Sequence, residues 1–134
     1  MLDKITRLAD LPARAAMSAI FILSALGKVS AFDMTQGYME AFGVPGVLLV
    51  PTIAFEFGAG MALLVGFRTR YCALLLAGFS LLAAAVFHRD FSDQIQQIMF
   101  LKNVAMAGGL LLLAKTGAPG QSIENLISRR RRSA

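Results

Sequence analysis

The chain has 134 residues, of which 57% are hydrophobic and 16% are charged, and its mean hydropathy is +0.65. A water-soluble domain has about a quarter charged residues, so this composition argues against a soluble globular fold. The net charge of +5 comes mostly from the arginines Arg129 to Arg132, which follow the last apolar block. We interpret this run as a membrane-surface cluster and not as a nucleic-acid site.

The apolar residues form four blocks, and each can be extended to the roughly 20 residues that a bilayer-spanning helix needs. The predicted fold is therefore all-α, an antiparallel bundle of four transmembrane helices. We assign residues 1–122 to this single domain and residues 123–134 to a basic tail. The predicted spans are residues 11–31, 46–66, 71–88 and 98–115.

The first apolar block also permits a second interpretation. A basic start, an apolar stretch from Ala15 to Leu26 and the ending Val29-Ser30-Ala31 are typical of a cleaved signal peptide. Lys28 lies unusually close to such a cleavage site, and three more spans follow, so we favour a retained first span. N-terminal sequencing of the mature protein distinguishes the two interpretations.

The segments between the spans are short. Residues 30–45 mix polar residues with Phe, Tyr and Met, which is typical of an interfacial or re-entrant segment. Residues 67–70 leave room only for a tight helical hairpin. Gly117 and Pro119 should end the fourth helix, and a short surface helix is expected before the arginine run.

The basic residues predict the orientation in the membrane. If both termini are cytoplasmic, that side carries ten of the thirteen Lys and Arg residues, and the far side carries Lys28, Arg89 and Lys102. Cytoplasmic loops of membrane proteins are enriched in Lys and Arg, so we predict a multi-pass protein with both termini inside.

Small residues recur every four positions along the second span, at Ala54, Gly58, Ala62 and Gly66. Such a stripe lets helix backbones approach closely, and we expect it to pack against a neighbouring span. Glu56 lies on a different face of the same helix.

Glu56 is the residue that most needs an explanation, because it lies in the middle of the second span. A charge at the centre of a spanning helix costs about 2.5 to 3.5 kcal/mol on insertion scales, so we expect it to have a partner. We expect an ion pair with Lys102 or Lys28. Asn103 and His88 are expected to complete a hydrogen-bonded network with it in the outer half of the bundle.

Three of these residues also have a purely structural interpretation. Lys28 could extend to the outer headgroups, and His88 could be an ordinary interfacial residue. The Glu56 ion pair could serve only to fix the register of two helices. The functional alternative is a carboxylate that binds a ligand or changes protonation during transport.

Several chemistries are excluded by residue counts. Cys72 is the only cysteine and His88 the only histidine, so there is no intrachain disulfide and no bis-histidine haem site. The sequence has no Cys and His spacing for zinc or an iron–sulfur cluster, so we predict no metal, and we identify no catalytic residue. No cofactor motif is evident. A quinone remains a candidate ligand, since a histidine and an ionisable partner can hydrogen-bond its carbonyls.

With these residues placed, the chain resembles the DoxX family of small bacterial membrane proteins over about residues 12 to 122. The resemblance rests on the order and spacing of Leu26-Gly27-Lys28, Phe42-Gly43-Val44-Pro45, Glu56, Leu64-Val65-Gly66, Thr69-Arg70, His88, Phe100-Leu101-Lys102-Asn103 and Gly108-Gly109-Leu110-Leu111.

The resemblance implies a four-helix protein of the bacterial inner membrane. The family's name associates it with subunits of membrane oxidoreductases, including quinone-reducing ones in sulfur metabolism. By this analogy the chain is a membrane component of, or anchor for, an oxidoreductase and not a stand-alone enzyme. The alternatives are a small proton-linked transporter and a structural scaffold. Co-purification of a reductase favours the oxidoreductase anchor, and uptake into vesicles favours the transporter.

Overall fold

The computed structural model describes residues 1–133. Four long helices account for most of them. They are α1 (Leu2–Ser30), α3 (Leu49–Val65), α4 (Thr69–Phe87) and α5 (Gln94–Thr116). Two shorter helices, α2 (Phe32–Ala41) and α6 (Ile123–Ser133), and a 3₁₀ turn, η1 (Gly46–Leu48), complete the described residues, which contain no strand. Counting η1 with α3, all four long helices are long and apolar enough to cross a membrane, which confirms the predicted fold class.

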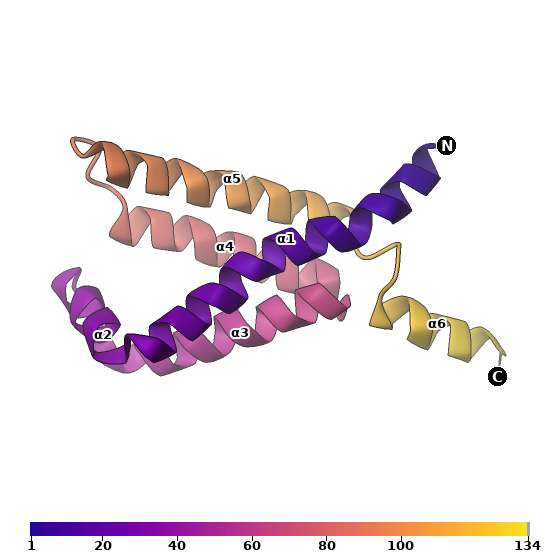
Figure 1. Cartoon of the computed structure of the whole chain (residues 1–134), viewed down its shortest axis with the longest axis horizontal. Coiled ribbons are helices and arrows are strands. Elements are labelled where there is room, and N and C mark those ends of the chain that lie inside the picture. Colours follow the sequence, from indigo (N-terminus) through magenta and orange to yellow (C-terminus); the bar gives the residue numbers. More distant parts are fainter. Residues whose placement is uncertain (134) are drawn as a thin grey trace.

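The long helices pack as two antiparallel pairs, α1 with α3 and α4 with α5 (Figure 1). The pairs meet near the end of the molecule that carries both chain termini, which we call the termini end. They diverge toward the opposite end, where α2 lies, which we call the α2 end (Figure 1). The core between the pairs consists of Phe21, Leu63, Ala73, Leu76, Ala77, Ala107, Leu110 and Leu113.

The close contact between α1 and α3 is made by a different face of α3 from the one predicted. A Cβ added at Gly60 would lie 3.0 Å from Ile22 Cγ1 and 3.4 Å from Phe21 Cβ, so the two backbones approach closely there. Ala54 and Gly58 are exposed, and a Cβ on Gly58 would meet nothing within 4 Å. The prediction that this stripe packs against another span is therefore wrong at these two positions. Spacing shows which residues share a face, but the burial of Glu56 decides which face points inward.

The ends of several helices differ from the sequence prediction. The first helix begins at Leu2 and not near Leu11, so its first turns extend past the bundle at the termini end (Figure 1). The last helix, α6, was expected to precede the arginine run, but it continues through those arginines to Ser133. Ala134, the last residue of the predicted tail, lies outside the described residues. Gly117 follows α5 with a φ of 69°, a conformation that favours glycine, and so ends that helix as predicted.

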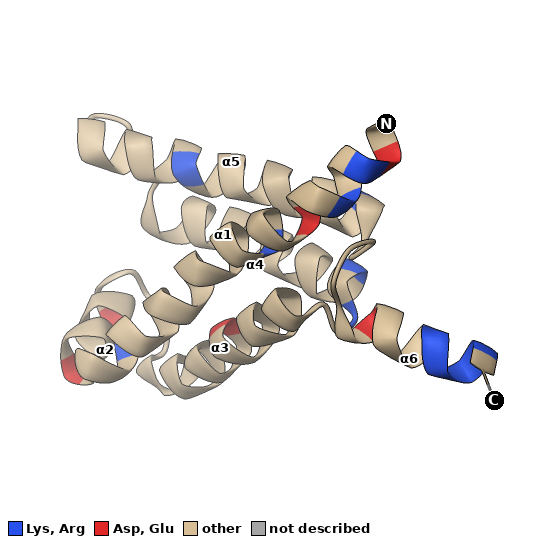
Figure 2. Ribbon diagram, turned by 45° about the vertical axis from the view of Figure 1, so that its right-hand side comes forward, with Lys and Arg blue, Asp and Glu red and all other residues tan. Residues whose placement is uncertain are grey.

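Charge is distributed unevenly along the molecule. Lys and Arg gather on α6 and on the first turns of α1, while the long helices carry few charges between their ends (Figure 2). The termini end is thus the basic end of the structure.

Candidate functional site

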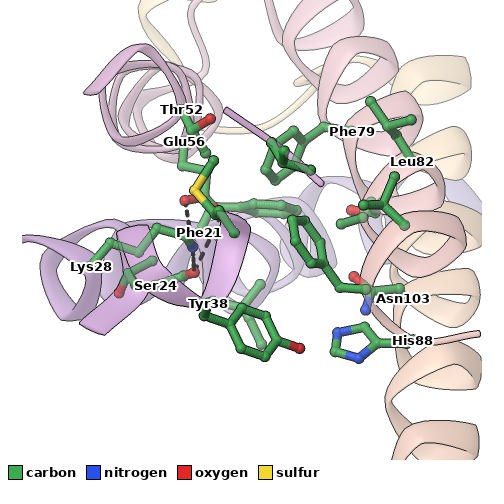
Figure 3. Close-up of a pocket in the computed structure, with 18 of the residues that line it drawn as sticks. Phe21, Ser24, Lys28, Tyr38, Thr52, Glu56, Phe79, Leu82, His88 and Asn103 are labelled. Carbon is green, nitrogen blue, oxygen red and sulfur yellow. Dashed lines mark hydrogen bonds and ion pairs between the residues drawn. The ribbon is translucent and has the colours of Figure 1, made fainter. Parts of the chain in front are cut away.

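A cavity of about 400 Å³ lies toward the α2 end, between the diverging helix pairs. Side chains from α1, α2, α3, α4 and α5 line it (Figure 3). Most of its wall is apolar and aromatic, because the inward faces of the spans are built from Phe, Leu, Met and Ala. The larger apolar side chains are Ile20, Phe21, Met39, Leu48, Phe79, Leu82, Phe87 and Met106.

The cavity brings together every polar side chain that the sequence analysis singled out. Lys28 and Glu56 line one wall, and His88, Lys102 and Asn103 line the wall formed by α4 and α5. Figure 3 shows the Glu56 group and the pair of His88 and Asn103 on opposite sides of the apolar middle. That these residues bind a ligand stays a prediction.

Glu56 forms its ion pair with Lys28. Lys28 Nζ lies 2.8 Å from Glu56 Oε2, and the Glu56 side chain is only 4% exposed against 23% for Lys28. Ser24 joins them: its hydroxyl donates to Glu56 Oε1 at 3.3 Å and accepts from Lys28 Nζ at 2.6 Å. Apart from this ion pair, Glu56 Oε2 has no hydrogen-bond partner among the described residues, and a carboxylate oxygen can accept more than one hydrogen bond, so it has room for a further donor.

Helix pairing explains why Lys28 and not Lys102 is the partner. Lys28 and Ser24 are one turn apart on α1, which packs directly against α3, the helix that carries Glu56. Lys102 is on α5, in the other pair, so the cavity separates it from Glu56. It is exposed and forms no ion pair within residues 1–133.

The predicted network between Glu56, His88 and Asn103 is wrong. His88 Nδ1 lies 2.9 Å from Gln96 Oε1, a contact across the loop between α4 and α5. Asn103 Nδ2 donates to the Met99 carbonyl one turn earlier on α5, at 2.9 Å. Both side chains are therefore held by their own helix pair, and the cavity has two separate polar groups.

Sequence reasoning missed three residues of the site. Ser24 could have been found, because it lies four residues before Lys28 and so shares its helix face. Tyr38 was placed only in the interfacial or re-entrant segment of residues 30–45. Its ring lies 5.6 Å from that of Phe87, and its hydroxyl points toward His88 (Figure 3). Nothing in the sequence marked Gln96 as a partner of His88, because their contact depends on how the loop between α4 and α5 folds.

A second buried charged group, also missed, lies at the termini end. Arg14 was counted among the basic residues of the cytoplasmic side, but its side chain is completely buried. It donates to both carboxylate oxygens of Asp10, at 3.1 and 3.0 Å. It also donates to the carbonyls of Leu63 and Leu64 at the end of α3, and to that of Gln121 after α5. Arg14 therefore ties the end of α3 and the segment between α5 and α6 to α1.

The comparison with known proteins agrees with this fold. The profile of the DoxX family matches residues 9–89, which include Lys28, Glu56 and His88. The chain belongs to the DoxX family. This DoxX protein is an integral inner-membrane protein with four apolar helices. The resemblance inferred from its motifs is thereby confirmed.

Two relatives from Escherichia coli strain K12 extend the match beyond the third span. The inner membrane protein YqjF is 44% identical over 129 residues, which cover 96% of this chain and 99% of YqjF. The inner membrane protein YphA is 36% identical over 119 residues, covering 84% of this chain and 85% of YphA. No solved structure matches this DoxX protein.

Proposed function

We propose that this DoxX protein binds a small lipid-soluble ring compound, a quinone or its reduced form, in the cavity at the α2 end. In this role it is a membrane component of, or anchor for, an oxidoreductase whose other subunit supplies the electrons. The observation that carries the proposal is the composition of the cavity: an apolar, aromatic middle with polar groups on two opposite walls. A volume of about 400 Å³ is within the range of small-molecule sites.

The two polar groups match the two ends of a quinone ring. Lys28 has three donors, and two are directed at Ser24 and Glu56, which leaves one for a ligand oxygen. On the other wall, His88 and Asn103 offer groups that can donate or accept. A ring with oxygens on opposite edges satisfies both walls, and its apolar faces match the aromatic lining, to which Phe21 and Phe79 belong.

Glu56 contributes to the proposed site by holding Lys28. A lysine near the end of a span is free to extend toward the headgroups. The carboxylate of Glu56 and the hydroxyl of Ser24 keep the ammonium at the cavity wall instead. With both termini cytoplasmic, as the basic residues predict, the site lies in the outer half of the membrane.

The test fills the cavity without touching its charges. Ala83 lines the cavity, while Ala85, two residues later on α4, is exposed on the lipid-facing surface. We expect wild-type protein purified in mild detergent to retain a quinone, measured by mass spectrometry of the extracted lipids. Ala83→Phe should lose it, and Ala85→Phe, which adds the same group outside the cavity, should keep it. Wild-type protein with no quinone above the membrane background, or equal retention in both variants, contradicts the proposal.

Proton-linked transport is the second candidate, and one observation favours it. Glu56 is a buried carboxylate between helix pairs that diverge, and its Oε2 has no hydrogen bond among the described residues besides the ion pair with Lys28. A transporter should move protons in proteoliposomes, and Glu56→Gln should abolish this flux while the protein stays folded. Absence of flux in wild-type proteoliposomes contradicts this candidate.

A further inference from the structure

A second cavity, of about 500 Å³, lies at the termini end, well away from the proposed quinone site. It is formed between the first turns of α1, the connector between α5 and α6 (residues 117–122) and the helix α6. Its lining combines two arginines with two leucines and several polar groups: Arg7, Leu8, Pro119, Gly120, Gln121, Ser122, Asn125, Leu126 and Arg129.

Partly buried hydrogen bonds hold the connector against α1 and so define the floor of this cavity. The Gly120 amide donates to Asp10 Oδ2 at 3.0 Å. A Cβ at Gly120 would lie 2.7 Å from the Arg7 carbonyl oxygen and 2.7 Å from Asp10 Oδ2, so only glycine fits there without a shift. Asn125 Nδ2 donates to the carbonyls of Ala118 and Gly120 and ties the connector to α6.

The helix α6 is also fixed to the bundle. The Glu124 amide donates to the Gly66 carbonyl at 3.2 Å, and Glu124 Oε1 accepts from the Thr69 amide at the start of α4, at 3.1 Å. Because Arg129 is on the same helix, these contacts set its position relative to Arg7.

The two arginines have no acidic partner among the described residues. No carboxylate within residues 1–133 lies within 4 Å of Arg7 or Arg129. The nearby acids are engaged elsewhere: Asp10 pairs with Arg14, and Glu124 caps α4. Asp3, one turn before Arg7, makes no ion pair with it. Two guanidinium groups on one cavity suit a phosphate, which each can bind through two parallel hydrogen bonds.

The leucines indicate what carries the phosphate. Leu8 is 75% exposed and Leu126 is 62% exposed, and both line the same cavity at the end of the membrane-spanning bundle. A soluble phosphate would leave them uncovered. We propose that this cavity binds the phosphate of an anionic phospholipid, with Arg7 and Arg129 on the phosphate and the leucines against the lipid's apolar part. This goes beyond a general attraction of the basic tail to the membrane, because it assigns the contact to two arginines.

The experiment compares two double variants of the full chain that lose the same charge. Arg7→Gln with Arg129→Gln alters the cavity, and Arg131→Gln with Arg132→Gln alters arginines of α6 that do not line it. All four are exposed, so both proteins should fold. Purified protein in a zwitterionic detergent is titrated with phosphatidylglycerol. Bound lipid is counted by native mass spectrometry and stability is followed by circular dichroism, since the chain has no tryptophan.

We expect one phosphatidylglycerol to bind wild-type protein saturably and to raise its Tm, and phosphatidylcholine to do neither. The cavity double variant should need about thirtyfold more phosphatidylglycerol for half-saturation, because each of the two basic residues near an anionic lipid contributes about 1 kcal/mol. The control double variant should stay within twofold of wild type.

Three results would overturn the proposal. Equal weakening in both double variants would mean a diffuse attraction without a site. No weakening in either would mean that the arginines do not bind the lipid. Protection by inorganic phosphate alone, equal to that by phosphatidylglycerol, would assign the cavity to a soluble ligand. If the cavity double variant is misfolded by circular dichroism, the single variant Arg129→Gln is compared with Arg132→Gln under the same criteria.

Discussion

The two ends of the bundle each contain a buried ion pair, and the two pairs are built differently. At the termini end, the Arg14 side chain is 0% exposed and Asp10 is 2% exposed. Every hydrogen bond of Arg14 goes to Asp10 or to a backbone carbonyl. At the α2 end, Lys28 is 23% exposed, Glu56 Oε2 has no hydrogen bond among the described residues besides its ion pair with Lys28, and both residues border a cavity.

This difference separates a structural pair from a candidate binding pair. A buried charge is tolerated when its hydrogen-bonding groups are satisfied. The Arg14 pair meets that condition with groups of the protein alone, so it has no capacity left for a ligand. The Glu56 pair leaves one donor on Lys28 and one acceptor on Glu56 free at a cavity wall. We therefore regard the first as a connection between chain segments and the second as part of a site.

The largest effect should come from breaking the ion pair of Arg14 and Asp10. Arg14→Ala leaves Asp10 buried without its partner and removes the donor for the carbonyls of Leu63, Leu64 and Gln121. Removing one partner of a buried pair costs about 3 to 5 kcal/mol, so we expect much lower yield and a lower Tm by circular dichroism. Arg131→Ala, an exposed arginine, should change the Tm little. An unchanged Tm in Arg14→Ala would remove the basis of the comparison.

A smaller loss of stability should follow from disturbing the connector after α5, which hydrogen-bonds to both Arg14 and Asp10. In Gly120→Ala the new methyl group would lie 2.7 Å from both the Arg7 carbonyl oxygen and Asp10 Oδ2. Such overpacking costs about 1 to 3 kcal/mol, and trypsin should cleave the basic tail faster as the connector shifts. Gly78→Ala is the matched control, because a Cβ there meets nothing within 4 Å and lies within a helix. It should gain roughly 0.5 to 1 kcal/mol of stability. Equal cleavage rates in the two variants would contradict the expected role of Gly120.

The smallest loss of stability should come from breaking the ion pair of Glu56 and Lys28. Glu56→Gln leaves Lys28 without its counter-ion, but Lys28 is 23% exposed and can turn toward the headgroups. We expect a cost of about 1 to 2 kcal/mol, below that of the fully buried pair. The double variant Glu56→Gln with Lys28→Gln should recover part of it, since no unpaired charge remains. A loss as large as that of Arg14→Ala, with no change in bound quinone, would make Glu56 a structural residue.

Much of the architecture could be predicted from local properties of the chain. Apolar runs of sufficient length predict spans, because a bilayer leaves a backbone few alternatives to a helix. Glu56 could be predicted to have a partner, since an isolated carboxylate at that depth is costly. The choice between Lys28 and Lys102 as that partner could not be predicted, because both lysines lie near the same predicted depth. It depends on which helices pair.

Other features had no local signal. Arg14 looks in sequence like one more basic residue before a span, and its burial follows from acceptors that lie 49, 50 and 107 residues further along the chain. The stripe of Ala54 and Gly58 has the spacing of a packing face, yet it is exposed, because α3 turns Glu56 and Gly60 toward α1.

By itself, the sequence determined that this is an all-α membrane protein with four spans and that Glu56 is buried with a partner. These properties follow from the cost of placing polar groups in hydrocarbon, which acts on each segment separately. Only the tertiary structure decided that the spans pair as α1 with α3 and α4 with α5. The divergence of the pairs opens the cavity, and the seating of the connector between α5 and α6 on Arg14 closes the other end. Both depend on contacts between residues far apart in the chain.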